Sequence, residues 1–328
     1  MRFSDPFDSR RNLWIIGFAF VVSALALPEV LPTFWIGIVT EMFIFGLFAL
    51  SFNLMYGYTG MLSFGHAAFY GIGAYGVAFV LAGKIPFVPA VEGLLPAIVL
   101  SVLIVTVVGA FAGVICVVRR GIYFAMLTLA VNMLFFTIAR EQDWLTGGRE
   151  GIFVGNPSVD LIIFSFSANE TALYYYFVFA VVAGAAVLML RVVNSPYGEL
   201  LKSIRENDQR TEFIGISVRR YTWSSFVLST AFAGLAGALF SIRMFLVNPS
   251  IMHWSVSAEP VFATLIGGPT TFFGPMFGAF VMTLLEEQLT GFTVFWQFWL
   301  GVLLIPIVLY FPKGILGNAL DYIKKQGS

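Results

Sequence analysis

The sequence predicts an all-α integral membrane protein with about ten transmembrane segments, and two observations support this. Of the 328 residues, 59% are hydrophobic and only 11% are charged, whereas a soluble domain carries about 25% charged residues. The chain also contains successive apolar runs near the length of roughly 20 residues that a helix needs to cross the bilayer. Because so few charges are available to face water, much of the surface is expected to face lipid.

Composition and motifs also argue against several functions. The formal net charge is zero, and no basic stretch alternates with aromatic residues, so nucleic acid is not expected as a partner. The single cysteine, Cys116, cannot form an internal disulfide. The chain has no His-Glu-x-x-His or Gly-x-Ser-x-Gly motif, and its only histidines are His66 and His253. We therefore expect no enzyme activity, no metal site and no cofactor.

The predicted segments follow one another in a single membrane domain, residues 1–328, with the bundle at 13–311. They cover residues 13–32, 36–56, 66–83, 94–118, 122–140, 172–190, 222–242, 256–267, 274–290 and 294–311. The first contains Ala24-Leu25-Ala26, which is similar to a signal-peptide cleavage site. The run is long for a signal peptide, so an uncleaved first helix is the preferred interpretation.

The eighth segment, 256–267, is too short to cross a bilayer alone and ends at Gly267-Gly268-Pro269. We expect a half-helix or broken helix there, which is tolerated at membrane depth only where protein or a water-filled cavity surrounds it. A second glycine-rich interruption, Gly57 to Gly65, occurs in the first half of the chain. Paired interruptions in two halves of a transporter indicate a transport route, although glycine-rich turns between helices are also common.

The distribution of basic residues predicts the orientation. With the N-terminus inside and ten segments, 14 of the 18 Lys and Arg residues lie on the cytoplasmic side. The external side keeps Lys84, Arg140, Arg149 and Arg243. The positive-inside rule therefore places both termini in the cytoplasm. It also makes 141–170 an external loop and 195–217 a cytoplasmic connection.

The cytoplasmic stretch 195–217 combines apolar and charged residues although it lies outside the bilayer. Pro196 can start a helix and Gly215 can end one with a positive φ, which predicts two short helices with a turn near Asn207-Asp208. Its apolar residues are Leu200, Leu201, Ile204, Phe213, Ile214 and Ile216. An apolar surface rimmed by charge fits a groove in a partner protein. The alternative is an amphipathic helix resting on the inner leaflet.

Four blocks in order carry a resemblance to a known family. The first block is Asn53 to Phe69, the second is Gly121 to Ala130, and the fourth is Gly267 to Ala279. The third block combines Arg205-Glu206-Asn207-Asp208, Gly215 and the run Ala233 to Leu239. The motif Pro312-Lys313-Gly314-Ile315 near the end also fits. Together they resemble the permeases of branched-chain amino-acid ABC importers. The chain length and the external loop are similar to the LivM-type inner-membrane subunit of that family.

The resemblance implies a type II ABC importer-like fold and several partners. These are ATP-binding cassette subunits, a second related permease and a periplasmic or lipid-anchored solute-binding protein. The chain has no Gly-x-x-x-x-Gly-Lys-Ser/Thr motif, so ATP hydrolysis must come from the partner subunits. The residues that the resemblance assigns to coupling with the ATPase are Leu201, Ile204, Arg205, Glu206, Asn207, Asp208 and Gly215.

Polar residues inside apolar segments are the candidates for a translocation pathway, because unpaired polar groups are costly in lipid. The set, which includes residues of the family blocks, is Asn53, Tyr56, Ser63, His66, Tyr123, Thr128, Asn132, Gly267 and Gly268. The alternative role for Asn53 and Asn132 is hydrogen bonding between helices, worth about 0.6 kcal/mol on average. For His66 we expect a structural cap at the start of a helix in preference to a proton relay.

Two other classes of function compete with the importer. A stand-alone secondary transporter or channel is expected to keep acidic residues in mid-membrane, and only Glu41 is a plausible one, since Glu286 and Glu287 are expected at the outer interface. A membrane scaffold gains nothing from interrupted helices. The resemblance favours branched-chain amino acids as the transported solute. Urea, short amides and aromatic acids are alternative solutes, because in such importers the binding protein determines which solute is transported.

Overall fold

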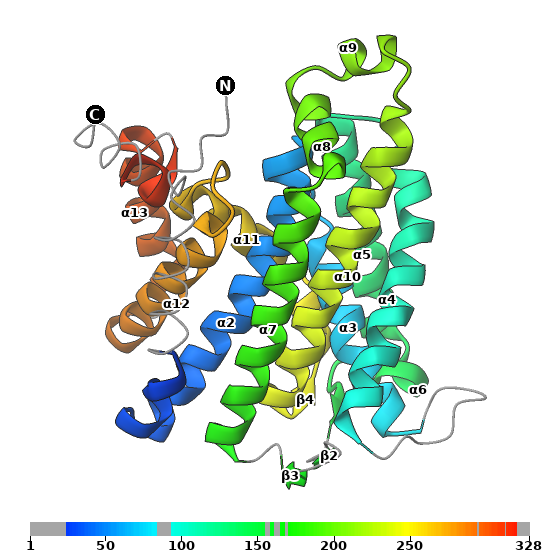
Figure 1. The fold of residues 1–328 in the computed structure, drawn as a ribbon. Coiled ribbons are helices and arrows are strands. Elements are labelled where there is room, and N and C mark those ends of the chain that lie inside the picture. The colour runs from blue at the N-terminus through cyan, green and yellow to red at the C-terminus, as the bar shows by residue number, and fades with distance from the viewer. Residues whose placement is uncertain are drawn as a thin grey trace.

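The computed structural model describes residues 24–83, 93–154, 158–160, 165–167, 170–293, 295–311 and 313–319. Long helices make up most of the described chain (Figure 1). They are α2 (Thr33–Asn53), α3 (His66–Leu81), α4 (Leu94–Cys116), α5 (Ile122–Glu141), α7 (Thr171–Val193), α10 (Val218–Met244), α11 (Trp254–Gly267), α12 (Gly274–Phe292) and α13 (Trp296–Tyr310).

Short elements connect these helices at the two ends of the bundle. They are the π-helix η1 (Leu54–Tyr58), α6 (Asp143–Thr146), β1 (Ile152–Phe153), β2 (Ser158–Asp160), β3 (Ser165–Ser167), α8 (Pro196–Glu206), α9 (Asp208–Phe213), β4 (Leu246–Val247) and the 3₁₀ helix η2 (Pro249–Met252). Helices α8 and α9 lie at one end of the bundle, whereas α6 and the strands lie at the other (Figure 1).

Nine of the ten predicted segments coincide with the nine long helices of the described chain. Their boundaries differ from the prediction by four residues at most. The first segment, 13–32, lies mostly outside the described residues. Among the described residues, five helices are long and apolar enough to cross a membrane by length and composition: Thr33–Tyr58 (α2 with η1), α4, α5, α7 and α10. The other four are shorter or less apolar.

Helix α10 lies at the centre of the bundle and packs against α2, α3 and α4. Small residues make this close packing possible. A β-carbon added at Gly234 would lie 2.6 Å from a methyl carbon of Val105 on α4, and one added at Gly237 would collide with the backbone carbonyl of Tyr70 on α3. Close approach of backbones through small residues is the usual way in which membrane helices associate.

The outer faces of α4 and α5 are apolar and exposed. Val99, Leu103, Val107 and Phe111 follow one another at four-residue spacing along α4, and each is more than half exposed. Residues at this spacing share one side of a helix. A stripe of large apolar side chains that the chain itself leaves uncovered is suited to lipid contact.

The external loop predicted at 141–170 has some ordered structure. Strand β1 pairs antiparallel with β4, so that Ile152 lies opposite Val247 and the loop is joined to the segment that follows α10. Strands β2 and β3 form a second antiparallel pair. The fold of the described residues is therefore helical, with two small strand pairs at the end opposite α8 and α9.

Candidate coupling site and membrane pathway

The predicted pair of short helices is present at one end of the bundle as α8 and α9. Pro196 occupies the first turn of α8, where a missing backbone N–H costs nothing. Asn207 separates the helices in an extended conformation, and its Oδ1 accepts a hydrogen bond of 2.8 Å from the backbone N of Arg210, which caps α9. Gly215 follows α9 with a φ of 85°, a value that favours glycine.

The apolar residues of this pair divide between an inward and an outward face. Leu201 and Ile204 are 0% and 2% exposed, so they pack inside the chain and cannot touch a partner, contrary to the contact role expected for them. Phe213 and Ile214 are 89% and 71% exposed. The surface that can dock a partner is therefore the tip formed by Phe213 and Ile214, next to the exposed Glu206 and Glu212.

Arg205 connects α8 to the first glycine-rich interruption. Its guanidinium donates a hydrogen bond to the backbone carbonyl of Gly57 in η1. Its aliphatic stem covers Gly60, where an added β-carbon would lie 2.9 Å from Cγ of Arg205. Arg205 therefore joins α8 to the end of α2, since η1 continues that helix.

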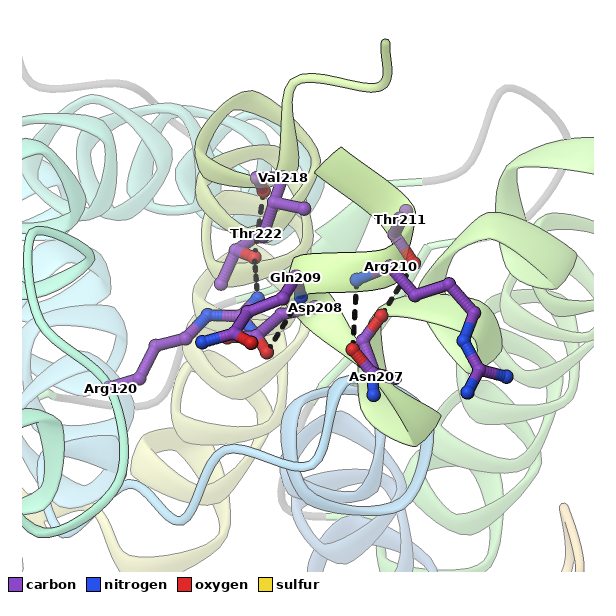
Figure 2. A network of polar contacts seen from close by, with 8 residues as sticks. All are labelled: Arg120, Asn207, Asp208, Gln209, Arg210, Thr211, Val218 and Thr222. Carbon is purple, nitrogen blue, oxygen red and sulfur yellow. Dashed lines mark hydrogen bonds and ion pairs between the residues drawn. The ribbon is translucent and has the colours of Figure 1, made fainter. Parts of the chain in front are cut away.

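A second connection joins α9 to the bundle through Arg120, which lies between α4 and α5 (Figure 2). Arg120 forms an ion pair of 2.8 Å with Asp208 and donates a hydrogen bond of 3.1 Å to Oγ1 of Thr222 on α10. Thr222 in turn donates to the backbone carbonyl of Val218 at 2.9 Å. In the sequence, Arg120 served only to predict the orientation. The pair Arg119-Arg120 and the acidic residues of the stretch 195–217 were predicted on the same side of the membrane, and this was a usable signal for an ion pair.

The two glycine-rich interruptions meet in space. A β-carbon added at Gly57 would lie 2.7 Å from the carbonyl oxygen of Pro269, and it would also collide with the side chain of Asn53. Gly268 has a φ of 109° and lies against the backbone of Lys313 and Gly314. Helix α11 ends at Gly267, as predicted for a half-helix. Its 14 residues span about 21 Å, short of the roughly 30 Å hydrocarbon core.

Thr128 on α5 bonds to the first interruption, and Ser63 forms a hydrogen bond within that interruption. Thr128 Oγ1 accepts a hydrogen bond of 3.1 Å from the backbone N of Phe64 and donates one of 2.9 Å to the carbonyl of Ala125. Ser63 Oγ accepts one of 3.3 Å from the backbone N of Gly65. Both side chains are buried, so in this conformation they stabilise the interruption and do not line an open channel.

His66 bonds across the bundle and does not cap a helix. It is the first residue of α3, but that helix has no side-chain cap. Its Nε2 lies 2.7 Å from Oγ of Ser229 on α10, and Ser229 donates a bond of 2.6 Å to the carbonyl of Ser51 on α2. The cap predicted for His66 is therefore wrong, because Nε2 bonds to a neighbouring helix, while Nδ1 is buried without a hydrogen-bond partner in the described residues.

The two asparagines behave differently. Asn132 is fully buried and donates a hydrogen bond of 2.9 Å to the carbonyl of Met252, while Ser257 donates to its Oδ1 at 3.5 Å. It joins α5 to η2 and α11, in line with the structural alternative. Asn53 is 1% exposed, and neither its oxygen nor its nitrogen finds a hydrogen-bond partner in the described residues.

The two candidate tyrosines lie away from these contacts. Tyr56 is half-buried in η1 and stacks on Phe52 with a ring separation of 5.6 Å. Tyr123 is 69% exposed at the start of α5, on the outer side of the bundle. The pathway role expected for Tyr123 stays a prediction. In the described part of the chain, no group of three or more His, Cys, Asp or Glu could hold a metal ion.

Charged residues in the part of the bundle away from α8 and α9 were underestimated from the sequence. Glu41 on α2 forms an ion pair of 3.6 Å with Arg243 near the end of α10. Glu259 lies inside α11, and Glu286 and Glu287 lie within α12 and not at its end. Glu259 therefore lies inside an apolar helix as Glu41 does, and the expectation that Glu41 is the only plausible intramembrane acid stays a prediction.

Comparison with known proteins identified one family and several relatives. A family model described as the permease component of branched-chain amino acid transport systems matches residues 34–311. The chain is 27% identical over 345 residues to the Escherichia coli K12 high-affinity branched-chain amino acid transport permease LivM, which covers 99% of this chain and 79% of the relative. It is 25% identical to BraD of Pseudomonas aeruginosa (84% and 92% covered) and 24% identical to LivH of E. coli K12 (84% and 91% covered). No solved structure gave a significant match.

Proposed function

Because the chain belongs to the family of branched-chain amino acid transport permeases, we propose that it imports leucine, isoleucine and valine as one permease subunit of an ABC importer. Members of this family are membrane transport subunits and not enzymes. The matched region covers nine long helices and both glycine-rich interruptions. The energy for uptake comes from separate ATPase subunits.

The observation that carries the proposal is the exposed apolar tip of α9. Phe213 and Ile214 project at the end of the bundle among charged side chains, 89% and 71% exposed. Large apolar residues presented together outside the membrane-spanning helices favour a protein partner. An ATP-binding cassette subunit with an apolar groove is such a partner, and burial of this pair would hold α9 against it.

The proposed mechanism is mechanical. ATP-driven closure of the two ATPase subunits moves α8 and α9. Arg205 passes this movement to η1 through the Gly57 carbonyl, and the ion pair between Arg120 and Asp208 passes it to α5 and α10. Because η1 contacts the Pro269 turn, both interruptions shift together. The bundle then alternates between outward-open and inward-open packings.

The remaining assignments follow from the same proposal. The chain has ten spans in a type II importer arrangement and lies in the cytoplasmic membrane, with both termini inside. A second related permease completes the pathway, and the match to both LivM and LivH is consistent with such a pair. A periplasmic or lipid-anchored solute-binding protein delivers the amino acid on the side of β1 and β4.

Purification from the native host tests this proposal. The affinity-tagged chain, extracted gently in detergent, is expected to bring ATPase subunits with it. Its ATP hydrolysis should rise when a binding protein loaded with leucine, isoleucine or valine is added. A chain that purifies alone, without ATPase activity in lipid and with solute flux that follows an ion gradient, would instead support a secondary transporter.

A further inference from the structure

Two residues at the glycine-rich interruptions carry buried polar atoms that have no hydrogen-bond partner in the described residues. Asn53, the last residue of α2, is 1% exposed, and neither its Oδ1 nor its Nδ2 is paired. Thr264, in the last turn of α11, is fully buried, and its Oγ1 is also unpaired. Buried polar groups are almost always paired, because an unpaired one loses the hydrogen bonds that it makes to water. These three atoms therefore indicate a partner outside the chain.

Helix packing directs Asn53 and Thr264 toward the same region of the bundle. Helices α2 and α11 pack against each other. Asn53 follows Ala49 by four residues and shares its side of α2, and Ala49 belongs to the same apolar cluster as Ile266 of α11. Thr264 follows Ser257 by seven residues, or about two turns, so both lie on one side of α11. Ser257 accepts a hydrogen bond of 3.0 Å from the backbone N of the second residue of α3. That side of α11 therefore faces the first interruption, which begins after Asn53 and ends where α3 starts.

The carbonyl of Pro269 adds a further acceptor next to the Asn53 amide. A β-carbon added at Gly57 would lie 2.7 Å from the carbonyl oxygen of Pro269 and closer still to Oδ1 of Asn53. These two oxygens are therefore less than twice that distance apart. The Pro269 carbonyl accepts no hydrogen bond from a described residue. It also follows the C-terminus of α11, where the helix dipole favours positive charge, and backbone carbonyls at such breaks in membrane helices can bind cations.

The chemistry of these groups fits the head of a free amino acid. A primary amide offers an acceptor and a donor side by side, and the ammonium and carboxylate of an amino acid are likewise adjacent. An ammonium nitrogen bonds to an oxygen at about 2.9 Å, so one ammonium group can bridge Oδ1 of Asn53 and the Pro269 carbonyl. Nδ2 of Asn53 and Oγ1 of Thr264 are donors for a carboxylate. All of these groups are uncharged, which suits a solute whose net charge is zero and avoids the cost of a fixed ion at membrane depth.

We propose that Asn53, Thr264 and the Pro269 carbonyl bind the ammonium and carboxylate of the amino acid in transit, and we call this group the junction site. This proposal rests on the proposed import function and adds to it the contacts that the solute makes with this chain. In the conformation described, Gly57 lies against both the Asn53 amide and the Pro269 carbonyl, so the junction site is closed. Arg205 holds the Gly57 carbonyl from α8. Movement of α8 that draws η1 away from the Pro269 turn therefore opens the junction site beside the coupling helices.

Thermal unfolding of the complex in nanodiscs separates a binding role from a structural one. Asn53→Ala removes an unpaired amide and Thr264→Val an unpaired hydroxyl, whereas Asn132→Ala removes an amide that bonds to the carbonyl of Met252. Asn194, which is exposed and follows α7, supplies the matched surface control. We expect Asn132→Ala to lower the unfolding temperature. The Asn53, Thr264 and Asn194 variants should leave it nearly unchanged, because none of them breaks a hydrogen bond within the chain.

Saturation-transfer NMR measures binding directly, on the assembled complex in nanodiscs without its solute-binding protein. The solutes are leucine, 4-methylpentanoate and 3-methylbutylamine; the last two keep the apolar side chain of leucine but lack its ammonium and its carboxylate, respectively. Spectra are recorded without nucleotide and with a non-hydrolysable nucleotide, because the junction site is closed in one packing of the bundle. In at least one of these states leucine should receive saturation from the unmodified complex.

We expect Asn53→Ala and Thr264→Val to reduce the leucine signal several-fold, Asn194→Ala to preserve it, and the signals of the two analogues to change little. No leucine signal from the unmodified complex in either state, or an equal signal from the Asn53 variant, would overturn the proposal. So would an equal loss for all three solutes, or an unfolding temperature of Asn53→Ala as low as that of Asn132→Ala, which would make Asn53 structural. A failure of the import function is recognised separately, because the unmodified complex would then not accumulate leucine with ATP and the loaded binding protein.

Discussion

Removal of the Phe213 side chain is expected to weaken ATPase binding without affecting the fold. The ring is 89% exposed in the free chain, so Phe213→Ala removes almost no intramolecular contact. Surface substitutions of this kind usually change stability by less than about 0.5 kcal/mol. If the ring is buried in a groove of the ATPase subunit, its loss removes the transfer free energy of a buried Phe, about 1.5–3 kcal/mol. That range corresponds to a dissociation constant raised about 10- to 100-fold.

The assay is a titration of the ATPase subunits onto the permease pair in nanodiscs, with Phe153→Ala as the matched control. Phe153 lies in β1 at the opposite end of the bundle and is 69% exposed, so it offers the same chemical change away from α9. We expect the Phe213 variant to bind about 10- to 100-fold more weakly and the Phe153 variant to bind normally, both with unchanged thermal unfolding. Equal affinity of the two variants would refute the assignment of α9 as the docking tip.

Three further predictions follow from individual contacts. Gly57→Val should lower the unfolding temperature in detergent and abolish uptake, because the added atoms collide with the Pro269 carbonyl. Overpacking of this kind typically costs about 1–3 kcal/mol. The control, Gly184→Val on α7, has open space around it and should change neither the unfolding temperature nor uptake. Asn132→Leu should destabilise the bundle by about 1–3 kcal/mol, measured by thermal unfolding, because the carbonyl of Met252 loses its donor; an unchanged unfolding curve would contradict that role. Arg120→Met should change stability by less than about 1 kcal/mol, since its ion pair with Asp208 is partly solvated, yet lower leucine uptake per ATP hydrolysed. An unchanged ratio of leucine to ATP would show that this ion pair transmits nothing.

The helices could be predicted from the sequence because the bilayer imposes their length and polarity. Nine segments were located closely, and the half-helix ending at Gly267 followed from its length and the glycines after it. The turn between α8 and α9 at Asn207 followed equally from local rules, since Pro196, Asn207 and Gly215 act on their own backbone.

What the sequence did not predict depends on contacts between distant segments. Leu201 and Phe213 look equally apolar, yet one packs inside the chain and the other is exposed, because only the bundle decides which face of α8 is covered. The bond from His66 to Ser229 joins residues 163 positions apart. Glu259 stands alone in its segment and becomes notable only where α12 brings Glu286 near it.

Uptake into proteoliposomes tests the central claim most directly. The purified complex, with ATP supplied on the side of its ATPase subunits and the loaded binding protein on the other, should accumulate labelled leucine against its gradient. Uptake should stop when a non-hydrolysable nucleotide replaces ATP, and it should persist when ion gradients are collapsed. Accumulation that needs an ion gradient and proceeds without ATP would contradict the account.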